Sequence, residues 1–500
     1  MAISGLLSLS GIDTKPMTRV QMAYKIKEAM DNIEEEKIPY YLSLDREHII
    51  YLQNILYKLI DEFRQELILI GVTTAQTHPE VEKSKLEKIF DFNIGAPVRT
   101  EHRFVNVNSG SDMLLENENG IRLEDGYNLR TRAYPWMNVL DTFTFSARPV
   151  LRITENDTEI SLDEGAAKLS LFNVELSLAK SAMWWGPGFH GAMLMSNNAK
   201  PLSLVRIRSI NNFKLPWVFS NMGSFGVNFF ASKLEEDRNI REPKFVGLRI
   251  EYSPLPYLCL GANRTSIMGG KDRPKLDLGD YWKIFMARSA DEFSPGEIRK
   301  TDTDQLASFD IKFTMPLRPE VRIASGLEVY AEWAGEDRFS FWENESPGLL
   351  AGFFLTDLFR DKGTDLRFEY AKNKPAWYRH GLYNASVSGT AYTYEGEIMG
   401  HHMGGDADSI FFRISKDVPF LTTPYFDSVK VGAQIDRERH RLNDPIQEEK
   451  VEVAFDTSWA HSSTLFFSLR YEFEKYKNFD YVSGKGSENH IFLAEVDMKF

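Results

Sequence analysis

The feature that most constrains this chain is a hydrophobic period of two residues, which runs from about Phe92 to Phe500. In "RIASGLEVYAEW", Leu327 and Val329 alternate with Glu328, and "DLRFEY", "TLFFSLRYEFEKY" and "VEVAF" behave in the same way. Successive side chains of a β-strand point to opposite faces, so each segment predicts an amphipathic strand. Turn-rich stretches separate the segments, and no helical pattern of comparable strength lies between them. The chain is therefore predicted to be mainly β, with antiparallel strands.

Soluble sandwiches or propellers and membrane barrels all contain many alternating strands, and the composition favours a transmembrane barrel. The chain has 35 Phe and 20 Tyr, and its apolar strand faces are heavily aromatic, as the interfacial girdles of a membrane barrel require. The opposite faces carry Arg and Glu in mid-strand, which suits a water-filled lumen. No stretch approaches the roughly 18 apolar residues of a spanning helix, which excludes a helical membrane protein.

The chain ends in "HIFLAEVDMKF", which predicts a final amphipathic strand that closes on an aromatic residue. Its apolar face carries Phe492, Ala494, Val496, Met498 and Phe500. Such an end matches the pattern by which outer-membrane barrels are recognised for insertion. We therefore interpret Phe492, Val496, Met498 and Phe500 as the insertion signal read by the barrel assembly machinery.

Chain length predicts the size of the barrel. Residues 91–500, about 410 residues at roughly 22 per strand and connection, give about 18 strands. A barrel this wide leaves an aqueous lumen unless something fills it. Residues 1–90 instead show helical periods within 14–33, 43–70 and 79–90. They predict a helical bundle that serves as a plug or cap, although the helix 43–70 could also pair with a partner protein.

Charge and cysteine content exclude several classes of function. The net charge of -13 argues against nucleic-acid binding, which calls for a basic stripe. The single cysteine, Cys259, excludes an intramolecular disulfide and a cysteine-based zinc site. The first residues carry no positive charge before Lys15 and do not form a complete secretory signal, so we expect a processed or truncated start.

Four stretches together resemble the capsule-assembly protein family typified by Wzi. They are "WWGPGFHGAMLMSNNAKPLSLVRIRS", "FGVNFFASKLEEDR", "LRFEYAKNKPAWYRHGLYN" and "YTYEGEIMGHHMGGDADSIFFRIS". The resemblance covers residues 90–500 in order, and the helical start "TKPMTRVQMAYKI" is also similar to that of relatives.

The resemblance implies an 18-stranded barrel in the outer membrane of a Gram-negative bacterium, with the helical bundle in the periplasm. It also implies a lectin-like protein that holds capsular or related exopolysaccharide at the cell surface. We expect a monomer surrounded by outer-membrane lipid, with no enzymatic activity, no cofactor and no metal. The alternatives are a porin for oligosaccharides or small solutes, and a soluble β-rich protein that acts on glycans.

The stretch from 183 to 201 is the first candidate polysaccharide site. The indole faces of Trp184 and Trp185 can stack on a pyranose ring, and Asn197 and Asn198 offer paired donors and acceptors for hydroxyls. Three glycines let this loop fold tightly back into the lumen, namely Gly186, Gly188 and Gly191. The alternative is a structural loop whose tryptophans pack against the barrel wall.

Two arginines follow this stretch in the sequence. Arg206 and Arg208 lie two residues apart, opposite Val205 and Ile207, so both are predicted to face the lumen. The guanidinium fork can bind the carboxylate of a uronic acid in a bidentate way. The alternative is a ladder of ion pairs with lumenal acids such as Glu251 or Glu328.

Several histidines lie near acidic or hydroxyl residues in the sequence, as the ligands of a metal site or the members of a catalytic group would. His401 and His402 lie near Asp406 and Asp408, but adjacent histidines in a strand point to opposite faces, and the glycines around them indicate a loop. We therefore predict a structural role. Ser386 and Ser388 near His380, and His461 before Ser462, stand in no recognised catalytic motif.

The interpretation of the chain end as an insertion signal predicts the effect of a one-residue deletion. Deleting Phe500 should greatly reduce the amount of protein assembled in the outer membrane, because the terminal aromatic residue is part of the recognised pattern. The readout is heat-modifiable gel mobility of the membrane fraction. A deletion protein that assembles as well as the full chain would contradict the interpretation.

Overall fold

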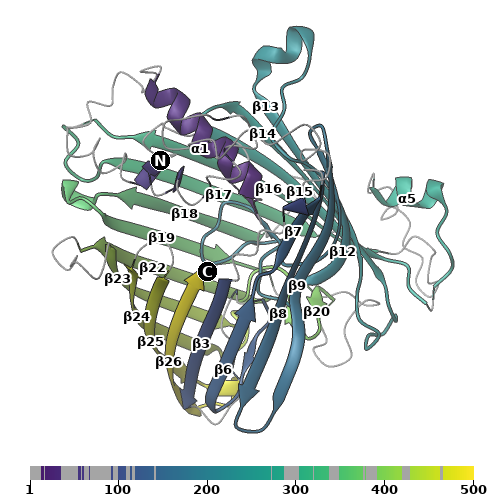
Figure 1. The fold of residues 1–500 in the computed structure, drawn as a ribbon. Helices are drawn as coiled ribbons and strands as arrows, with labels where there is room; N and C mark the ends of the chain where they lie inside the picture. The colour runs from purple at the N-terminus through teal and green to yellow at the C-terminus, as the bar shows by residue number, and fades with distance from the viewer. Residues whose placement is uncertain are drawn as a thin grey trace.

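A computed structural model gives the fold of the chain, a closed β-barrel (Figure 1). It describes Leu9, most of residues 13–34, several positions between 55 and 72, and residues 92–499. Within that last range the gaps are 94–98, 109–112, 286–302, 337–347, 375–390 (save Tyr378), 419–427, 462–464 and a few shorter ones. The described strands form a wall of 18 antiparallel strands, which confirms the predicted fold class and size.

The wall follows chain order, and the last strand pairs with the first. The strands are β3 (Arg99–Asn108), β6 (Gly126–Ala133), β8 (Phe143–Thr154), β9 (Thr158–Leu171), β10 (Val174–Ser181), β12 (Leu202–Ser209), β13 (Ser224–Lys233), β14 (Lys244–Leu255), β15 (Leu258–Met268), β16 (Thr303–Pro316), β17 (Gly326–Glu336), β18 (Gly348–Thr356), β19 (Thr364–Lys372), β22 (Ala407–Asp417), β23 (Ser428–His440), β24 (Glu448–His461), β25 (Leu465–Lys477) and β26 (Gly486–Lys499). Two short strands lie beside the wall: β7 (Trp136–Val139) pairs with β8, and β2 (Phe92–Asn93) pairs with β7. Closure leaves no open sheet edge in this wall, as a membrane requires.

The predicted alternation fixes which side chains face the lumen. On β17, Glu328, Tyr330 and Glu332 are buried, whereas Val329 is 39% exposed on the outer surface. On β26, Phe492 is 54% exposed, whereas its neighbours Ile491 and Leu493 are buried inside. The outer face is therefore apolar, and the inner face carries most of the charge. Phe500, the last residue of the proposed insertion signal, lies outside the described residues.

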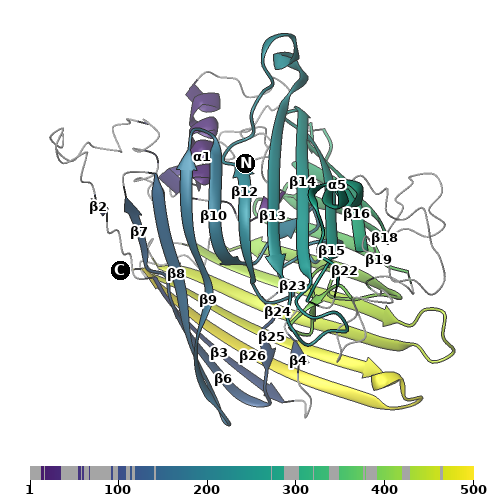
Figure 2. The same ribbon diagram turned by 90° about the vertical axis from the view of Figure 1, so that its right-hand side faces the viewer.

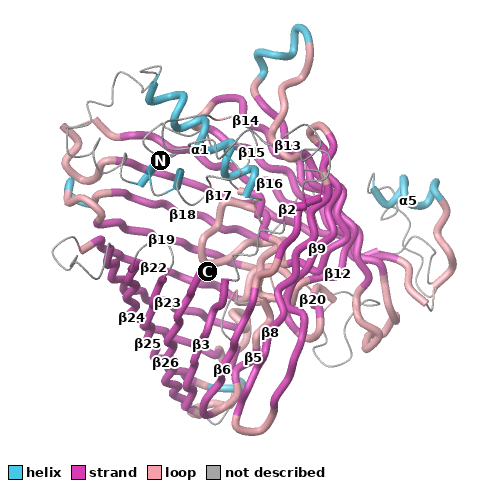
Figure 3. Tube along the Cα trace, viewed as in Figure 1, coloured by secondary structure: helices cyan, strands magenta, loops and turns pink. Residues whose placement is uncertain are grey.

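The two mouths of the barrel differ in their connections. At one mouth, most connections are shorter, and two of them are two-residue turns, 172–173 and 256–257. At the other, several connections are long, among them residues 182–201 and 373–406. Figure 3 shows α5 (Leu278–Phe285) beyond the strand ends, and Figure 2 shows the barrel turned by 90°. We call these the short-turn mouth and the long-loop mouth.

The helix α1 (Arg19–Glu34) lies at the short-turn mouth, drawn purple in Figure 1. Gln21 donates to the carbonyl oxygen of Ile210 in the connection that precedes η1 (Trp217–Met222). The buried residues Ala23, Ile26 and Ala29 pack against a set from the following segment, namely Leu56, Ile60, Leu67 and Val72. These contacts bring together the first two predicted helices, whereas the third, 79–90, lies outside the described residues. In the described part of the chain, no helix is long and apolar enough to cross a membrane.

Candidate functional site

Residues 182–201, here called the glycine loop, connect β10 to β12 and fold back into the barrel. Trp185, Ala192, Met193 and Leu194 have no exposed surface. Trp185, Met193 and Leu194 belong to one apolar cluster with wall residues such as Phe230. Apolar side chains therefore occupy the lumen at this level, where an open channel would carry water.

Two wall glutamates hold the backbone of the glycine loop. Glu369 on β19 accepts from the backbone N–H groups of Phe189, His190 and Gly191, at 2.8, 3.1 and 3.2 Å. Glu332 on β17 accepts from the N–H of Met193 at 3.0 Å. A buried loop has no water to satisfy its backbone donors, so these carboxylates take the place of a sheet partner.

Hydroxyl groups on the wall donate hydrogen bonds to the same two glutamates. Tyr330 donates its hydroxyl to Glu369 at 2.8 Å, and Ser308 donates to Glu332 at 2.8 Å. Hydrogen bonds to a charged acceptor contribute about 1.5–3 kcal/mol each, more than neutral ones. The wall and the glycine loop are thus joined by a network of buried hydrogen bonds that centres on Glu369 and Glu332.

The amino-terminal residues 13–15, here called the amino-terminal strap, reach the glycine loop inside the barrel. β1 (Thr14–Lys15) pairs with β11 (Trp184–Trp185) as a two-stranded sheet. Arg249 on β14 donates to the Thr14 hydroxyl at 2.7 Å, and Lys312 on β16 donates to Asp13 at 2.8 Å. Because α1 follows at the short-turn mouth, the strap extends inward from that side while the glycine loop descends from the other.

A second inward segment, residues 391–406, packs on the glycine loop and is here called the tyrosine–histidine loop. It contains β20 (Thr393–Tyr394) and β21 (Glu397–Ile398). Ser196 donates from its backbone to the carbonyl of Met399 at 2.9 Å, and Asn198 donates to the carbonyl of Ile398 at 3.0 Å. Tyr392 donates to Thr265 on the wall at 2.8 Å. The strap and the two loops together form the plug.

The glycines of the glycine loop stand where a side chain would collide. A Cβ on Gly191 would lie 2.3 Å from the His401 ring, and one on Gly188 would lie 2.0 Å from the carbonyl oxygen of Gly191. Gly186 has a φ of +118°, which strains any other residue. The close approach of the two loops therefore depends on Gly191, and the fold of the glycine loop itself depends on Gly186 and Gly188.

The predicted sugar-binding residues of this loop are mostly covered. Trp185 packs at 5.4 Å from Phe230, and Trp184, which is 8% exposed, lies under the Lys15 ammonium at 5.3 Å. Asn198 is buried between the two loops, whereas Asn197 keeps part of its surface. This arrangement gives the tryptophans a packing role in the plug, and their contact with sugar stays a prediction.

Arg206 and Arg208 face the lumen, as the alternation predicts. Both contact Glu175 on β10, Arg206 at 3.4 Å and Arg208 at 3.0 Å. The acidic partner is thus Glu175 rather than Glu251 or Glu328. Because Glu175 stands just after the 172–173 turn, the pair lies toward the short-turn mouth, away from Asn198. The structure therefore spreads the six predicted contact residues over separate places, and recognition of uronic acids by the arginines stays a prediction.

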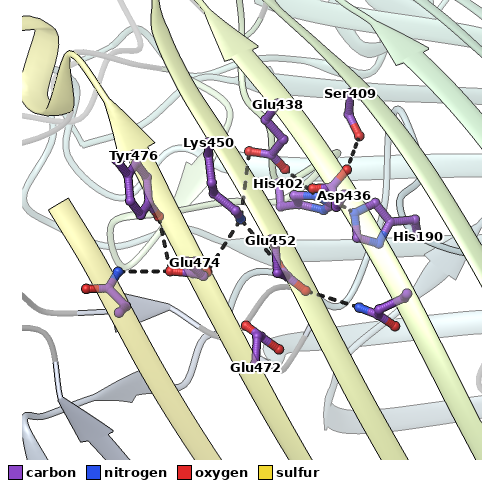
Figure 4. A network of polar contacts seen from close by, with 12 residues as sticks. His190, His402, Ser409, Asp436, Glu438, Lys450, Glu452, Glu472, Glu474 and Tyr476 are labelled. Atoms are coloured by element: carbon purple, nitrogen blue, oxygen red, sulfur yellow. Dashed lines mark hydrogen bonds and ion pairs between the residues drawn. The ribbon is translucent and has the colours of Figure 1, made fainter. Parts of the chain in front are cut away.

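The histidines gather more closely than the sequence suggests. His402 lies 2.9 Å from Glu438 on β23, and His190 of the glycine loop lies 3.4 Å from Asp436 (Figure 4). His401 turns instead toward Gly191, and burial beside His402 and His190 lowers its pKa well below the usual value. His401 is therefore neutral at pH 7, in agreement with a structural role.

Sequence reasoning missed three members of this group, His190, Asp436 and Glu438. The pair Asp436 and Glu438 could have been noticed as two acids on one lumenal face of "AQIDRERH". His190 carries no such signal, because its position depends on how the glycine loop folds. Asp408, named with the histidines in the sequence, pairs instead with Arg439 at 2.9 Å.

Fold and site together define a class: an outer-membrane β-barrel whose lumen is filled by its own loops and amino-terminal strap. A model of the family described as "Capsule assembly protein Wzi" matches residues 102–491. The chain belongs to this family. A protein of Klebsiella pneumoniae, described as an uncharacterized 55.8 kDa protein in the cps region, is 24% identical over 190 residues. Those residues are 37% of this chain, and the match spans 35% of that relative's length.

Solved structures with the same fold include Wzi of Escherichia coli. It is described as an outer-membrane protein involved in group 1 capsule assembly and as a carbohydrate-binding β-barrel. The two structures align with a TM-score of 0.66 and 16% identity over 100% of this chain and 96% of that one, which shows a shared fold. OccK3 (OpdO) of Pseudomonas aeruginosa aligns over 83% of this chain and 97% of that one, with a TM-score of 0.45 and 13% identity.

The Glu369 network predicts the behaviour of a cysteine probe in the glycine loop. In a Cys259→Ala background, an Ala192→Cys protein should react slowly with a maleimide, because residue 192 is fully covered. Adding Glu369→Ala should raise that rate at least about tenfold, since several charge-assisted bonds of about 1.5–3 kcal/mol are lost. Adding Asp456→Ala instead, which removes a wall carboxylate bonded to Arg413, should leave the rate unchanged. Equal rates in the Glu369 and Asp456 variants would contradict the role of Glu369.

Proposed function

We propose that this chain is a non-enzymatic outer-membrane protein that binds capsular or related surface polysaccharide and holds it at the cell surface. Membership of the capsule assembly family supports this function, as does the description of Escherichia coli Wzi as a carbohydrate-binding barrel. The observation that carries the proposal is the apolar core inside the lumen, which includes Trp185, Met193 and Tyr392. A barrel filled in this way is better suited to anchoring a polymer than to conducting solutes.

The two mouths suggest an orientation in the membrane. Outer-membrane barrels have short turns on the periplasmic side and longer loops outside. The short-turn mouth would then face the periplasm, together with α1 and the rest of residues 1–90 as a helical bundle. The glycine loop and the tyrosine–histidine loop would enter the lumen from outside the cell. In this orientation, the outer surface of the plug meets the polysaccharide.

Polar side chains at the outer surface of the plug have chemistry suited to sugars. Lys200 at the end of the glycine loop pairs with Glu395 at 2.8 Å, and both are nearly half exposed. Arg122 pairs with Glu397 at 2.7 Å and is 55% exposed. An exposed pair such as Lys200–Glu395 is weak, about 0–1 kcal/mol, so sugar hydroxyls and carboxylates can compete for it. Retention of a polymer would then rest on many weak contacts acting together.

The porin alternative has less support. A solute pathway would have to pass the glycine loop, the tyrosine–histidine loop and the amino-terminal strap. The glycine loop is hydrogen-bonded to Glu332 and Glu369, the strap to Arg249, and the tyrosine–histidine loop to Thr265. Opening such a pathway would break several of these bonds at once, at a cost of several kcal/mol.

A tryptophan substitution tests the function. Replacing both Trp184 and Trp185 with Ala should lower polysaccharide retention about two- to tenfold, because losing buried aromatic packing of about 0.5–1.5 kcal/mol loosens the plug whose outer surface meets the polysaccharide. The measurement compares cell-bound with released polysaccharide in cells whose own gene is replaced by the variant. Heat-modifiable mobility checks that the barrel still assembles.

The matched control is Trp217→Ala, which removes an indole that is 88% exposed at the short-turn mouth. It should leave retention unchanged. Purified full-length protein should also bind the polysaccharide released by the same cells. Normal retention in cells that lack the protein altogether would overturn the proposed function.

A further inference from the structure

Four buried side chains with metal-binding atoms meet where the plug touches the barrel wall (Figure 4). His190 comes from the glycine loop and His402 from the tyrosine–histidine loop. Asp436 and Glu438 lie two residues apart on β23 and point into the lumen from the same face. Three segments distant in sequence therefore each bring at least one potential ligand to a single point.

The distances within this group are close to those of a metal site. One ligand atom from each residue lies within 4.8 Å of every other. His402 Nε2 is 2.9 Å from Glu438 Oε1, and His190 Nε2 is 3.4 Å from Asp436 Oδ2. Tetrahedral zinc with bonds of about 2.0–2.2 Å separates its ligands by roughly 3.3–3.6 Å. Small side-chain shifts would bring the four atoms to that spacing.

The donor set selects a class of cation. Imidazole nitrogens suit zinc, copper, iron or nickel, whereas Ca²⁺ and Mg²⁺ prefer oxygen ligands alone. Two neutral imidazoles and two carboxylates would give a neutral complex with a divalent ion. Such neutrality matters here, because the side chains of Asp436 and Glu438 are 0% and 4% exposed and burying uncompensated charge is costly.

Neighbouring groups also contact the two acids. Lys450 lies 4.0 Å from Glu438, but it is also 3.6 Å from Glu452 and 3.7 Å from Glu474. Its single charge is thus shared among three carboxylates. His440 lies 3.2 Å from the other oxygen of Glu438, and the Ser409 hydroxyl donates to Asp436 at 3.0 Å. These contacts orient the acids and leave the oxygens nearest the two histidines directed at the shared point.

We propose that His190, His402, Asp436 and Glu438 bind one divalent transition-metal ion of the Zn²⁺ class. The ion joins both plug loops to β23 and so fastens the plug to the wall. Because every coordination position is supplied by the protein and buried, the site is structural rather than catalytic. The Asn117 side-chain amide lies 3.2 Å from Nδ1 of His402.

The test uses the full-length protein folded in detergent and stripped of metal with a chelator. Titration with Co²⁺ should produce the visible absorption bands of tetrahedral cobalt and saturate at one ion per chain. Zn²⁺ should displace the cobalt and raise the temperature at which the barrel unfolds. The variants His190→Gln and Asp436→Asn should each abolish the tetrahedral spectrum while retaining heat-modifiable mobility.

The matched control is His102→Gln, which removes a wall histidine that contacts Thr131, outside the group. It should bind cobalt like the wild-type chain. The cobalt spectrum of the wild-type protein tests the proposal even if a variant fails to fold. Absence of a tetrahedral cobalt spectrum in the intact chain would overturn the proposal, as would equal binding by wild type and a folded His190→Gln protein.

Discussion

The arrangement of the lumen depends on one constraint, that a loop buried inside a barrel must satisfy its own backbone. Water cannot do so, and the glycine loop has almost no regular secondary structure to supply internal partners. Glu332 and Glu369 on the wall meet this need. They accept hydrogen bonds from four backbone N–H groups of the loop, those of residues 189, 190, 191 and 193. Once the loop is fixed there, Trp185 is positioned to pair with the amino-terminal strap, and Asn198 is positioned to pair with the tyrosine–histidine loop.

Buried charges in the lumen also require partners inside the barrel. Burying an ion is tolerated only when partners compensate it, and the wall places its acids beside arginine, lysine or backbone donors. Glu175 forms ion pairs with Arg206 and Arg208. Asp310 forms an ion pair with Arg249, and Arg249 donates a hydrogen bond to Thr14 of the strap. The result is a polar wall around an apolar core, so the barrel interior resembles that of a folded domain more than that of a channel.

Alternation along the strands was enough to predict the barrel, its approximate strand number and the lumenal position of Arg206 and Arg208, because strand geometry is local. The path of the glycine loop was not predictable in the same way. Its tryptophans could equally well be sugar platforms or core residues from sequence alone, and contacts with Phe230 and Lys15 decide their burial. His190 approaches Asp436 only because that path brings residues 246 positions apart together, which no local pattern encodes.

The central claim is that the intact chain closes its own lumen. The most direct test is the single-channel conductance of full-length protein, purified, folded in detergent and placed in a planar bilayer. The account predicts a silent protein at moderate voltage, because opening requires several charge-assisted bonds to break together. It also predicts that removing the amino-terminal residues 1–90 makes opening easier than in the intact chain, because the glycine loop then loses its pairing with the strap. Large and steady conductance from the intact chain would contradict the account and would make the barrel a porin.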